Sequence, residues 1–229
     1  MTVVVALALT GVREITLEQS ELNEDIFNKR AVLASVNDYL GMGAGVEADD
    51  LTDEQVVEIF ATKMQQFVFD TKGNPIDGVM AEDIEMEKEK KKAVEDRRLP
   101  LYVYEFEGET FFILAVRGNG LWDEIWGNIA LKSDASTIIG ASFDHKGETP
   151  GLGAEIKDNP VFPRSFKQKQ IFKDGNFVSV KVRKGGARDK VYEVDGISGA
   201  TVTGDGVDKM LREGLALYLP FLNEKRKEQ

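Results

Sequence analysis

The 229-residue chain contains no cysteine and only one histidine, His145. The absence of cysteine excludes disulfide bonds, cysteine-ligated zinc, iron–sulfur clusters and thiol catalysis. A single histidine also excludes metal sites built from several histidines. Basic residues are fewer than acidic ones, 29 against 40, which gives a formal net charge of −11. Because a phosphate backbone binds a clustered basic face, this balance argues against nucleic acid as a partner.

Long hydrophobic runs are scarce as well. One unbroken apolar run covers Val3 to Leu9, whereas a helix that crosses a bilayer needs ~20 such residues. No basic region precedes the run and no clear cleavage site follows it, which argues against a signal peptide. The run is either the buried start of a strand or helix, or the end of a membrane anchor. We favour the anchor, because the next segment resembles a stalk.

An amphipathic helix is predicted after this run, and Gly41 to Gly45 end it. Its apolar face carries Ile15, Leu22, Ile26, Leu33, Val36 and Leu40. Thr52 and Gln55 then form a capping box that opens a second helix. The apolar side of this second helix carries Val56, Ile59, Phe60, Met64 and Phe67. We interpret the charge run over residues 82–98 as a solvated helix or arm, because acidic residues mixed into it argue against a basic docking patch.

From residue 99 the pattern becomes typical of strands. We expect strands over residues 101–106, 111–116 and 137–142, and a hairpin around Asp174-Gly175-Asn176. A last helix is expected over residues 205–219. The prediction is an α+β protein with an antiparallel sheet and an N-terminal helical stalk. It has three parts: the remnant of a membrane anchor over 1–12, a stalk and helical subregion over 13–98, and an α+β domain over 99–229.

Two loops concentrate small and polar residues, at 145–153 and at 195–206. Such residues form turns, and Thr203 or Asp205 is a candidate N-cap for the last helix. The same composition ahead of a helix also suits a phosphate group, and Gly199 and Ala200 leave the Thr201 hydroxyl accessible. On the residues alone, the capped turn is the favoured interpretation. The chain has no P-loop motif and no GxSxG motif, and Gly118-Asn119-Gly120 lacks the third glycine of a dinucleotide fingerprint.

Four motifs carry a family resemblance. Residues 195–201, DGISGAT, match the flavinylation motif Dxx[ST]GAT of FMN-binding domains. The segments GNGLW (118–122), GETPGLGAEI (147–156) and KGGA (184–187) resemble companion signatures in the same family. The chain therefore resembles the C subunits of the Na+-translocating NADH:quinone oxidoreductases. The G subunits of the Rnf complexes are close cousins, but residues 120–140 resemble the quinone-reductase branch better.

The resemblance implies that Thr201 carries FMN through a phosphoester bond, which a flavin transferase installs from FAD. The other expected cofactor-binding residues are Trp122, Glu148, Thr149, Leu152, Gly153, Lys184, Ser198, Gly199, Ala200, Val202 and Thr203. Leu152 is expected as an apolar wall for the ring and Lys184 as a counter-charge. Trp122 is expected either near the ring or in the core. Asp195 is expected to shape either the turn or the recognition site of the transferase, and His145 has no expected chemical duty.

The resemblance also implies the function of an electron carrier, with no catalytic centre and no metal of its own. Electrons from NADH arrive through other subunits and pass to a second flavin on the way to quinone, while sodium export is coupled elsewhere. We expect no activity of the isolated chain. The expected location is the bacterial inner membrane, with one membrane helix and a soluble domain that faces the periplasm. The alternatives are a G subunit of the Rnf type and a membrane-tethered scaffold without cofactor.

Overall fold

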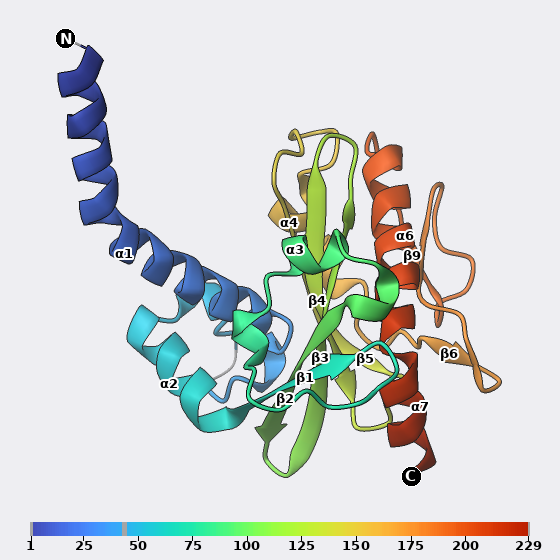
Figure 1. Cartoon of the computed structure of the whole chain (residues 1–229). Helices are drawn as coiled ribbons and strands as arrows, with labels where there is room; N and C mark the ends of the chain where they lie inside the picture. The colour runs from blue at the N-terminus through green and yellow to red at the C-terminus, as the bar shows by residue number, and fades with distance from the viewer. Residues whose placement is uncertain (1, 43–44, 229) are drawn as a thin grey trace.

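The computed structural model describes residues 2–42 and 45–228, with the side chains of Val5, Leu17, residues 19–42 and residues 45–228. A five-stranded antiparallel sheet forms its centre, in the order β1-β2-β3-β4-β5. Helices lie on both faces of this sheet (Figure 1). The predicted α+β class with an N-terminal helix and an antiparallel sheet is confirmed.

Each strand of the central sheet pairs with the next one along the chain. The strands are β1 (Met64–Asp70), β2 (Arg98–Phe106), β3 (Glu109–Asn119), β4 (Glu124–Lys132) and β5 (Ile138–His145). Glu107 and Gly108 join β2 to β3, and both have positive φ, 50° and 83°, as in a tight hairpin turn. The three strands predicted between residues 101 and 142 are confirmed, whereas β4 was not predicted.

The N-terminal helical layer covers one face of the sheet. It consists of α1 (Thr2–Ala34), the 3₁₀ turns η1 (Asn37–Tyr39) and η2 (Ala48–Asp50), and α2 (Asp53–Lys63). Leu33, Val36 and Leu40 are buried in one cluster with Ile113 and Tyr104 of the sheet. Gly140 of β5 permits this close approach, because a methyl group there would lie 2.3 Å from the carbonyl oxygen of Ser35.

The predicted stalk is one continuous helix only as far as Ala34. Val36 and Leu40, which were predicted on its apolar face, lie beyond its end and flank the turn η1. The predicted apolar face of the helix is only partly buried, since Leu22 is 50% exposed. The side chains of Ile15 and of the apolar run, apart from Val5, lie outside the described residues. Among the residues that are described, no helix is both long and apolar enough to cross a membrane. The division of the chain at residues 12 and 98 stays a prediction.

The second predicted helix is correct at its start and wrong at its end. The Thr52 hydroxyl accepts from the N–H of Gln55 at 3.3 Å, so the capping box forms. The helix ends at Lys63, and Met64 and Phe67 belong to strand β1 instead. Phe67 is 40% exposed and pairs with Leu101 of β2. Hydrogen bonding to β2 at the sheet edge thus overrides the helical spacing of these apolar residues.

The charge run is not one solvated helix or arm. It folds as three short pieces, η3 (Ala81–Asp83), α3 (Met86–Lys90) and η4 (Val94–Asp96). The Glu87–Lys91 ion pair forms at 2.7 Å. Glu89, however, is 2% exposed, and its carboxylate accepts from the backbone and guanidinium of Arg98 and from Lys92. Part of the run is therefore anchored to the start of β2.

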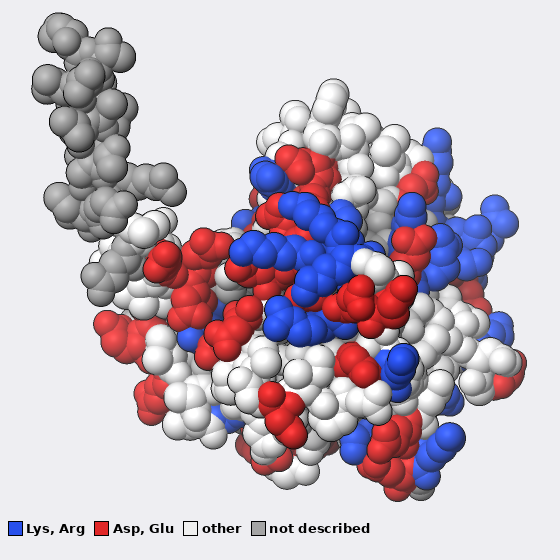
Figure 2. Space-filling view, in the orientation of Figure 1, with Lys and Arg blue, Asp and Glu red and all other residues white. Residues whose placement is uncertain are grey.

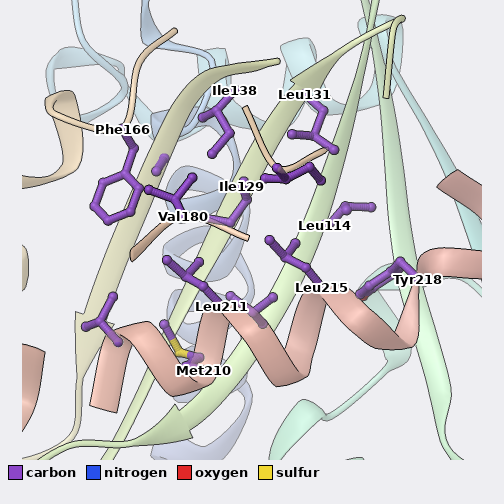
Figure 3. Packing of buried hydrophobic residues seen from close by; sticks show 14 of the residues in the cluster. Leu114, Ile129, Leu131, Ile138, Phe166, Val180, Met210, Leu211, Leu215 and Tyr218 are labelled. Atoms are coloured by element: carbon purple, nitrogen blue, oxygen red, sulfur yellow. The ribbon is translucent and has the colours of Figure 1, made fainter. Parts of the chain in front are cut away.

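The C-terminal layer covers the opposite face. It consists of α4 (Glu155–Asp158), α5 (Val161–Arg164), the hairpin β6 (Phe172–Lys173) and β7 (Asn176–Phe177), the parallel pair β8 (Lys181–Arg183) and β9 (Glu193–Asp195), α6 (Thr201–Leu217) and α7 (Leu219–Lys227). Figure 3 shows Met210, Leu211 and Leu215 of α6 directed at the apolar side chains of the sheet. The Tyr218 hydroxyl donates to the carbonyl oxygens of Pro100 and Ala115 at 2.9 and 3.0 Å.

The last helix begins earlier than predicted. It starts at Thr201, with Ala200 as the N-cap, so Thr203 and Asp205 are helical residues and not caps. The predicted hairpin around Asp174 and Gly175 is confirmed. Its second strand is short, because residues 181–183 leave the hairpin and pair in parallel with β9.

Candidate cofactor site

Three segments that are distant in the sequence meet at one end of the sheet, at the top of Figure 1. They are the β3–β4 turn at 119–123, the loop at 146–154 that follows β5, and the loop at 196–200 that leads into α6. The GNGLW, GETPGLGAEI and DGISGAT motifs occupy these segments. Each motif therefore lies at the end of a strand or at the start of a helix, where the backbone is held by regular structure.

Glu148 joins the three segments. Its Oε1 accepts from the backbone N–H groups of Trp122 and Asp123 at 2.9 and 3.4 Å. Its Oε2 accepts from the hydroxyl of Thr203 at 2.6 Å. The residue is 5% exposed. Burial raises the pKa of this carboxyl, but the hydrogen bonds from Thr203 and the backbone outweigh burial and hold the pKa below its usual range. Glu148 is therefore a buried, ionised bridge.

Glycines are required where these segments touch. A methyl group on Gly120 would lie 2.5 Å from Glu148 Oε1, and one on Gly153 would lie 2.4 Å from Thr203 Oγ1. At Gly199, φ is +83° and a methyl group would lie 2.8 Å from the carbonyl oxygen of Gly151. The glycines of the three motifs therefore allow backbone and carboxylate to approach closely.

The start of α6 leaves room for an anion. Thr201 is the first helical residue and is half-buried, whereas Ser198 and Gly199 before it are exposed. Ala200 is the N-cap, and no side chain of the described residues accepts a hydrogen bond from this helix end. The first N–H groups of a helix have no partner within the helix and carry its positive dipole end. The Thr201 hydroxyl thus lies beside donors that suit a phosphate group.

Two acidic residues hold the KGGA segment against β9. The Asp195 carboxylate accepts from the N–H of Ala187 at 2.6 Å. Glu193 accepts from the N–H of Arg188 and from Arg183 Nε, both at 2.8 Å. The hydrogen bond from Arg188 leads the contributions that lower the pKa of Glu193 to about 2. Asp195 thus links the start of the loop ahead of Thr201 to the KGGA segment, and its part in shaping the turn stays a prediction.

Apolar side chains surround this end of the molecule. Trp122 is 65% exposed, Val202 is 53% exposed and Leu152 is 42% exposed. Trp122 is thus not a core residue. Figure 2 shows a largely uncharged surface at the top of the molecule, above a band of mixed charge. Exposed apolar side chains and the backbone donors at the start of α6 thus lie at the same end of the molecule, where a ligand with a flat ring and a phosphate finds partners for both.

Most expected cofactor-binding residues are therefore near one another, but their surroundings differ. Thr149 and Lys184 are exposed, and Gly153 and Ala200 are buried. The Thr203 hydroxyl is fully buried and donates to Glu148, so only its backbone N–H remains a candidate phosphate donor. Lys90 of α3, which no sequence motif indicated, donates to the carbonyl oxygen of Gly118 and to Glu124, both at 3.1 Å, and so supports the β3–β4 turn.

Comparison with known proteins gives a consistent result. The family model described as "FMN-binding domain" matches residues 120–216. The C subunit of the Na+-translocating NADH-quinone reductase from Haemophilus ducreyi is 43% identical over 103 residues, which cover 45% of this chain and 40% of that protein. The corresponding protein from Vibrio anguillarum is 35% identical over 170 residues, 66% of each protein. The chain thus spans less than half the length of the Haemophilus relative and about two thirds of the Vibrio relative.

Two solved structures share the fold. The crystal structure of the C subunit from Parabacteroides distasonis is 36% identical, with a TM-score of 0.77, and covers 89% of this chain and 94% of that chain. The structure of NqrC from Shewanella oneidensis is 25% identical, with a TM-score of 0.73, over 90% and 99% of the two chains. On this combination of sequence identity, coverage and fold, the chain belongs to the NqrC family, the C subunits of the Na+-translocating NADH-quinone reductases.

Proposed function

We propose that this protein is an electron-transfer subunit that carries FMN, bound covalently to Thr201, within a Na+-translocating NADH:quinone reductase complex. The observation that carries the proposal is the position of Thr201 at the uncapped start of α6, within the DGISGAT motif. Family membership supports FMN as the cofactor. The relatives are C subunits of the quinone reductase, which favours this function over that of an Rnf protein.

The residues present fit an esterified FMN. Attachment from FAD forms one bond between Thr201 Oγ1 and the phosphorus of the FMN half, and it breaks the bond from that phosphorus to the bridging oxygen. AMP leaves, and the hydroxyl proton passes to a base of the flavin transferase. The small residues Ser198, Gly199 and Ala200 leave space for that enzyme beside Thr201. No cysteine is present for a bond to the flavin ring, which agrees with attachment through the phosphate.

The chain itself binds and orients the cofactor. The N–H groups of the first turn of α6 stabilise the phosphate, and Lys184 adds positive charge. Leu152, Val202 and Trp122 form apolar surface for the ring, and Thr149 and Gly153 line the loop beside it. When bound, FMN supplies the electron-transfer chemistry, while the protein fixes its position and tunes its potential.

The complex supplies the remaining steps of the function. Electrons from NADH reach the protein through other subunits, pass on to a second flavin, and finally reduce quinone. We place the protein at the bacterial inner membrane, with its folded domain in the periplasm and a membrane anchor at its N-terminal side. The exposed apolar rim at the candidate site supports this role, because a carrier exchanges electrons with a partner through an accessible cofactor.

The test is attachment of FMN to the full chain, co-expressed with a flavin transferase. The wild-type protein is expected to gain the mass of one FMN less one water, with flavin absorbance that survives denaturation. Thr201→Ala is expected to lose both signals, because it lacks the attacking hydroxyl. Thr62→Ala, at an exposed threonine of α2 away from the site, is the hydroxyl control and retains the mass gain. A wild-type protein that stays unmodified, or a Thr201→Ala variant that still gains the mass, contradicts the proposal.

A further inference from the structure

His145 is the only histidine of the chain and the last residue of β5. It pairs with Ile125 of β4, at the end of the sheet where the candidate site lies. Its ring Nδ1 accepts a hydrogen bond from the backbone N–H of Glu148 at 3.2 Å. Its Nε2 is buried and has no hydrogen-bond partner among the described residues. His145 as a whole is half-buried, and both ring nitrogens face the protein, Nδ1 towards the loop that carries Glu148.

Because Nδ1 accepts a hydrogen bond, the tautomer of the neutral ring is determined. A neutral imidazole has one N–H donor and one acceptor nitrogen, so acceptance at Nδ1 requires the proton to be on Nε2. An Nε2–H group that is buried without a partner is unfavourable, so the ring is held here by its other contacts, among them the bond from the Glu148 N–H.

The bond at Nδ1 determines where the Glu148 carboxylate lies. It fixes the Glu148 backbone three residues after the strand ends, and from there the side chain reaches the amides of Trp122 and Asp123 and the hydroxyl of Thr203. The far half of the loop has a separate anchor, because Glu155 accepts from the N–H of Gly153 at 3.1 Å. His145 is thus one anchor of the first half, beside the Lys146 N–H, which donates to the carbonyl oxygen of Glu124 at 3.0 Å.

We infer that His145 is a positioning residue for the cofactor site: by accepting from the Glu148 N–H, it holds the carboxylate that joins the three motif segments. The role in cofactor attachment rests on the proposed function, whereas the hydrogen bond itself does not. His145 acts through Glu148, and the property it controls is the order of the loop before FMN is attached.

A first test uses the wild-type chain without flavin. Because the protein has one histidine, ¹⁵N NMR of the imidazole gives a single pair of nitrogen signals. The expected result at neutral pH is the Nε2–H tautomer, with Nδ1 unprotonated and accepting. A ring that carries its proton on Nδ1 overturns the inference. This measurement needs no variant, so it decides the matter even if a substitution prevents folding.

A second test compares two substitutions at the same site. His145→Leu removes the acceptor, whereas His145→Asn keeps an oxygen close to the position of Nδ1. In the unloaded His145→Leu protein, the Glu148 amide is expected to exchange its hydrogen about tenfold faster than in wild type, the change that loss of a hydrogen bond of ~1.4 kcal/mol gives. His145→Asn is expected to restore protection. Lys146→Ala, at an exposed neighbour, is the matched control and is expected to exchange like wild type.

The same variants then report on attachment. His145→Leu is expected to slow the initial rate of FMN transfer to Thr201 by about tenfold, and His145→Asn is expected to stay close to wild type. Equal amide exchange and equal transfer rates in His145→Leu and wild type overturn the inference while the proposed function stands. If wild type takes up no FMN, the proposed function fails. The tautomer and the exchange rate then still show whether His145 accepts a hydrogen bond from the Glu148 N–H.

Discussion

At the scale of single residues, the candidate site depends on positions where a side chain is absent. Gly120 is one such position, since a methyl group there would meet a carboxylate that three hydrogen bonds hold in place. The carboxylate cannot move aside without losing those bonds. Gly120→Ala is therefore expected to lower the free energy of unfolding by about 1–3 kcal/mol, as overpacking does. Chemical denaturation measures this loss.

Gly147 provides the matched control for Gly120. A methyl group there would come no closer than 3.8 Å to the nearest atom, which is an ordinary contact. Gly147→Ala is expected to leave the free energy of unfolding within about 0.5 kcal/mol of wild type. A Gly120→Ala protein as stable as the Gly147→Ala protein would contradict the central position of Glu148.

At the residue level, the sequence is informative where a motif fixes a residue's neighbours along the chain. The DGISGAT motif indicates Thr201 as the attachment residue, which stays a prediction, and the structure places this residue at the first position of a helix. The hydroxyl of Thr203 was expected at the phosphate, but it donates to Glu148, which is 55 residues away in the sequence. His145 was given no role for the same reason. Such pairings depend on tertiary contacts that the local pattern does not contain.

At the scale of secondary-structure elements, α6 must lie close to β3 for the start of the helix to reach the site. Gly206 allows this, because a methyl group there would lie 2.3 Å from the carbonyl oxygen of Asn119. Gly206→Ala is expected to push the helix from the sheet and to cost about 1–3 kcal/mol of unfolding free energy. The measurement is the denaturation midpoint, together with the yield of attached FMN.

Gly204, on the same helix, is the control. A methyl group there would lie 3.5 Å from Val182 Cγ1, an ordinary contact. Since alanine favours helix over glycine, Gly204→Ala is expected to be neutral or to stabilise by up to about 1 kcal/mol. If both variants lose stability equally, a methyl group at either position of α6 destabilises the protein, and the close approach of α6 to β3 is not the cause.

The elements that the sequence did not predict have a common physical reason. β4 is buried along most of its length because helical layers cover both faces of the sheet. A strand buried on both faces has no alternation of apolar and polar residues, so periodicity does not reveal it. β1, in contrast, has apolar residues at a spacing that also suits a helix. Only its pairing with β2 determines that this segment forms a strand. The hairpins and helix caps, which depend on local residues, were predicted correctly at Thr52 and at Asp174-Gly175.

At the scale of the whole molecule, stability is expected to fall in acid. The pKa of Glu193 is about 2, below its ordinary value of 4.5, so the folded form binds its proton less readily than the unfolded form. The contribution of Glu193 is present above pH ~4.5 and is lost as the pH falls towards ~2. The Glu148 carboxyl, whose pKa is also lowered, acts in the same direction. The free energy of unfolding is therefore expected to decline over this range.

The comparison of wild type with Glu193→Gln isolates one carboxylate. The variant has no carboxylate at position 193 that could be protonated. Its free energy of unfolding is therefore expected to fall less steeply than that of wild type between pH ~5 and pH ~3, as measured by urea denaturation at each pH. Parallel curves for the two proteins would show that the hydrogen bonds from Arg188 and Arg183 do not stabilise the ionised form.

The attachment of FMN to Thr201 is the claim from which the electron-transfer role follows. Its most direct test is the intact mass of the protein purified from its own organism, followed by mapping of the modified peptide. The account predicts one FMN, less one water, on the peptide that contains Thr201, together with flavin absorbance after denaturation. An unmodified chain from cells with an active flavin transferase, or a flavin on a different residue, would contradict it.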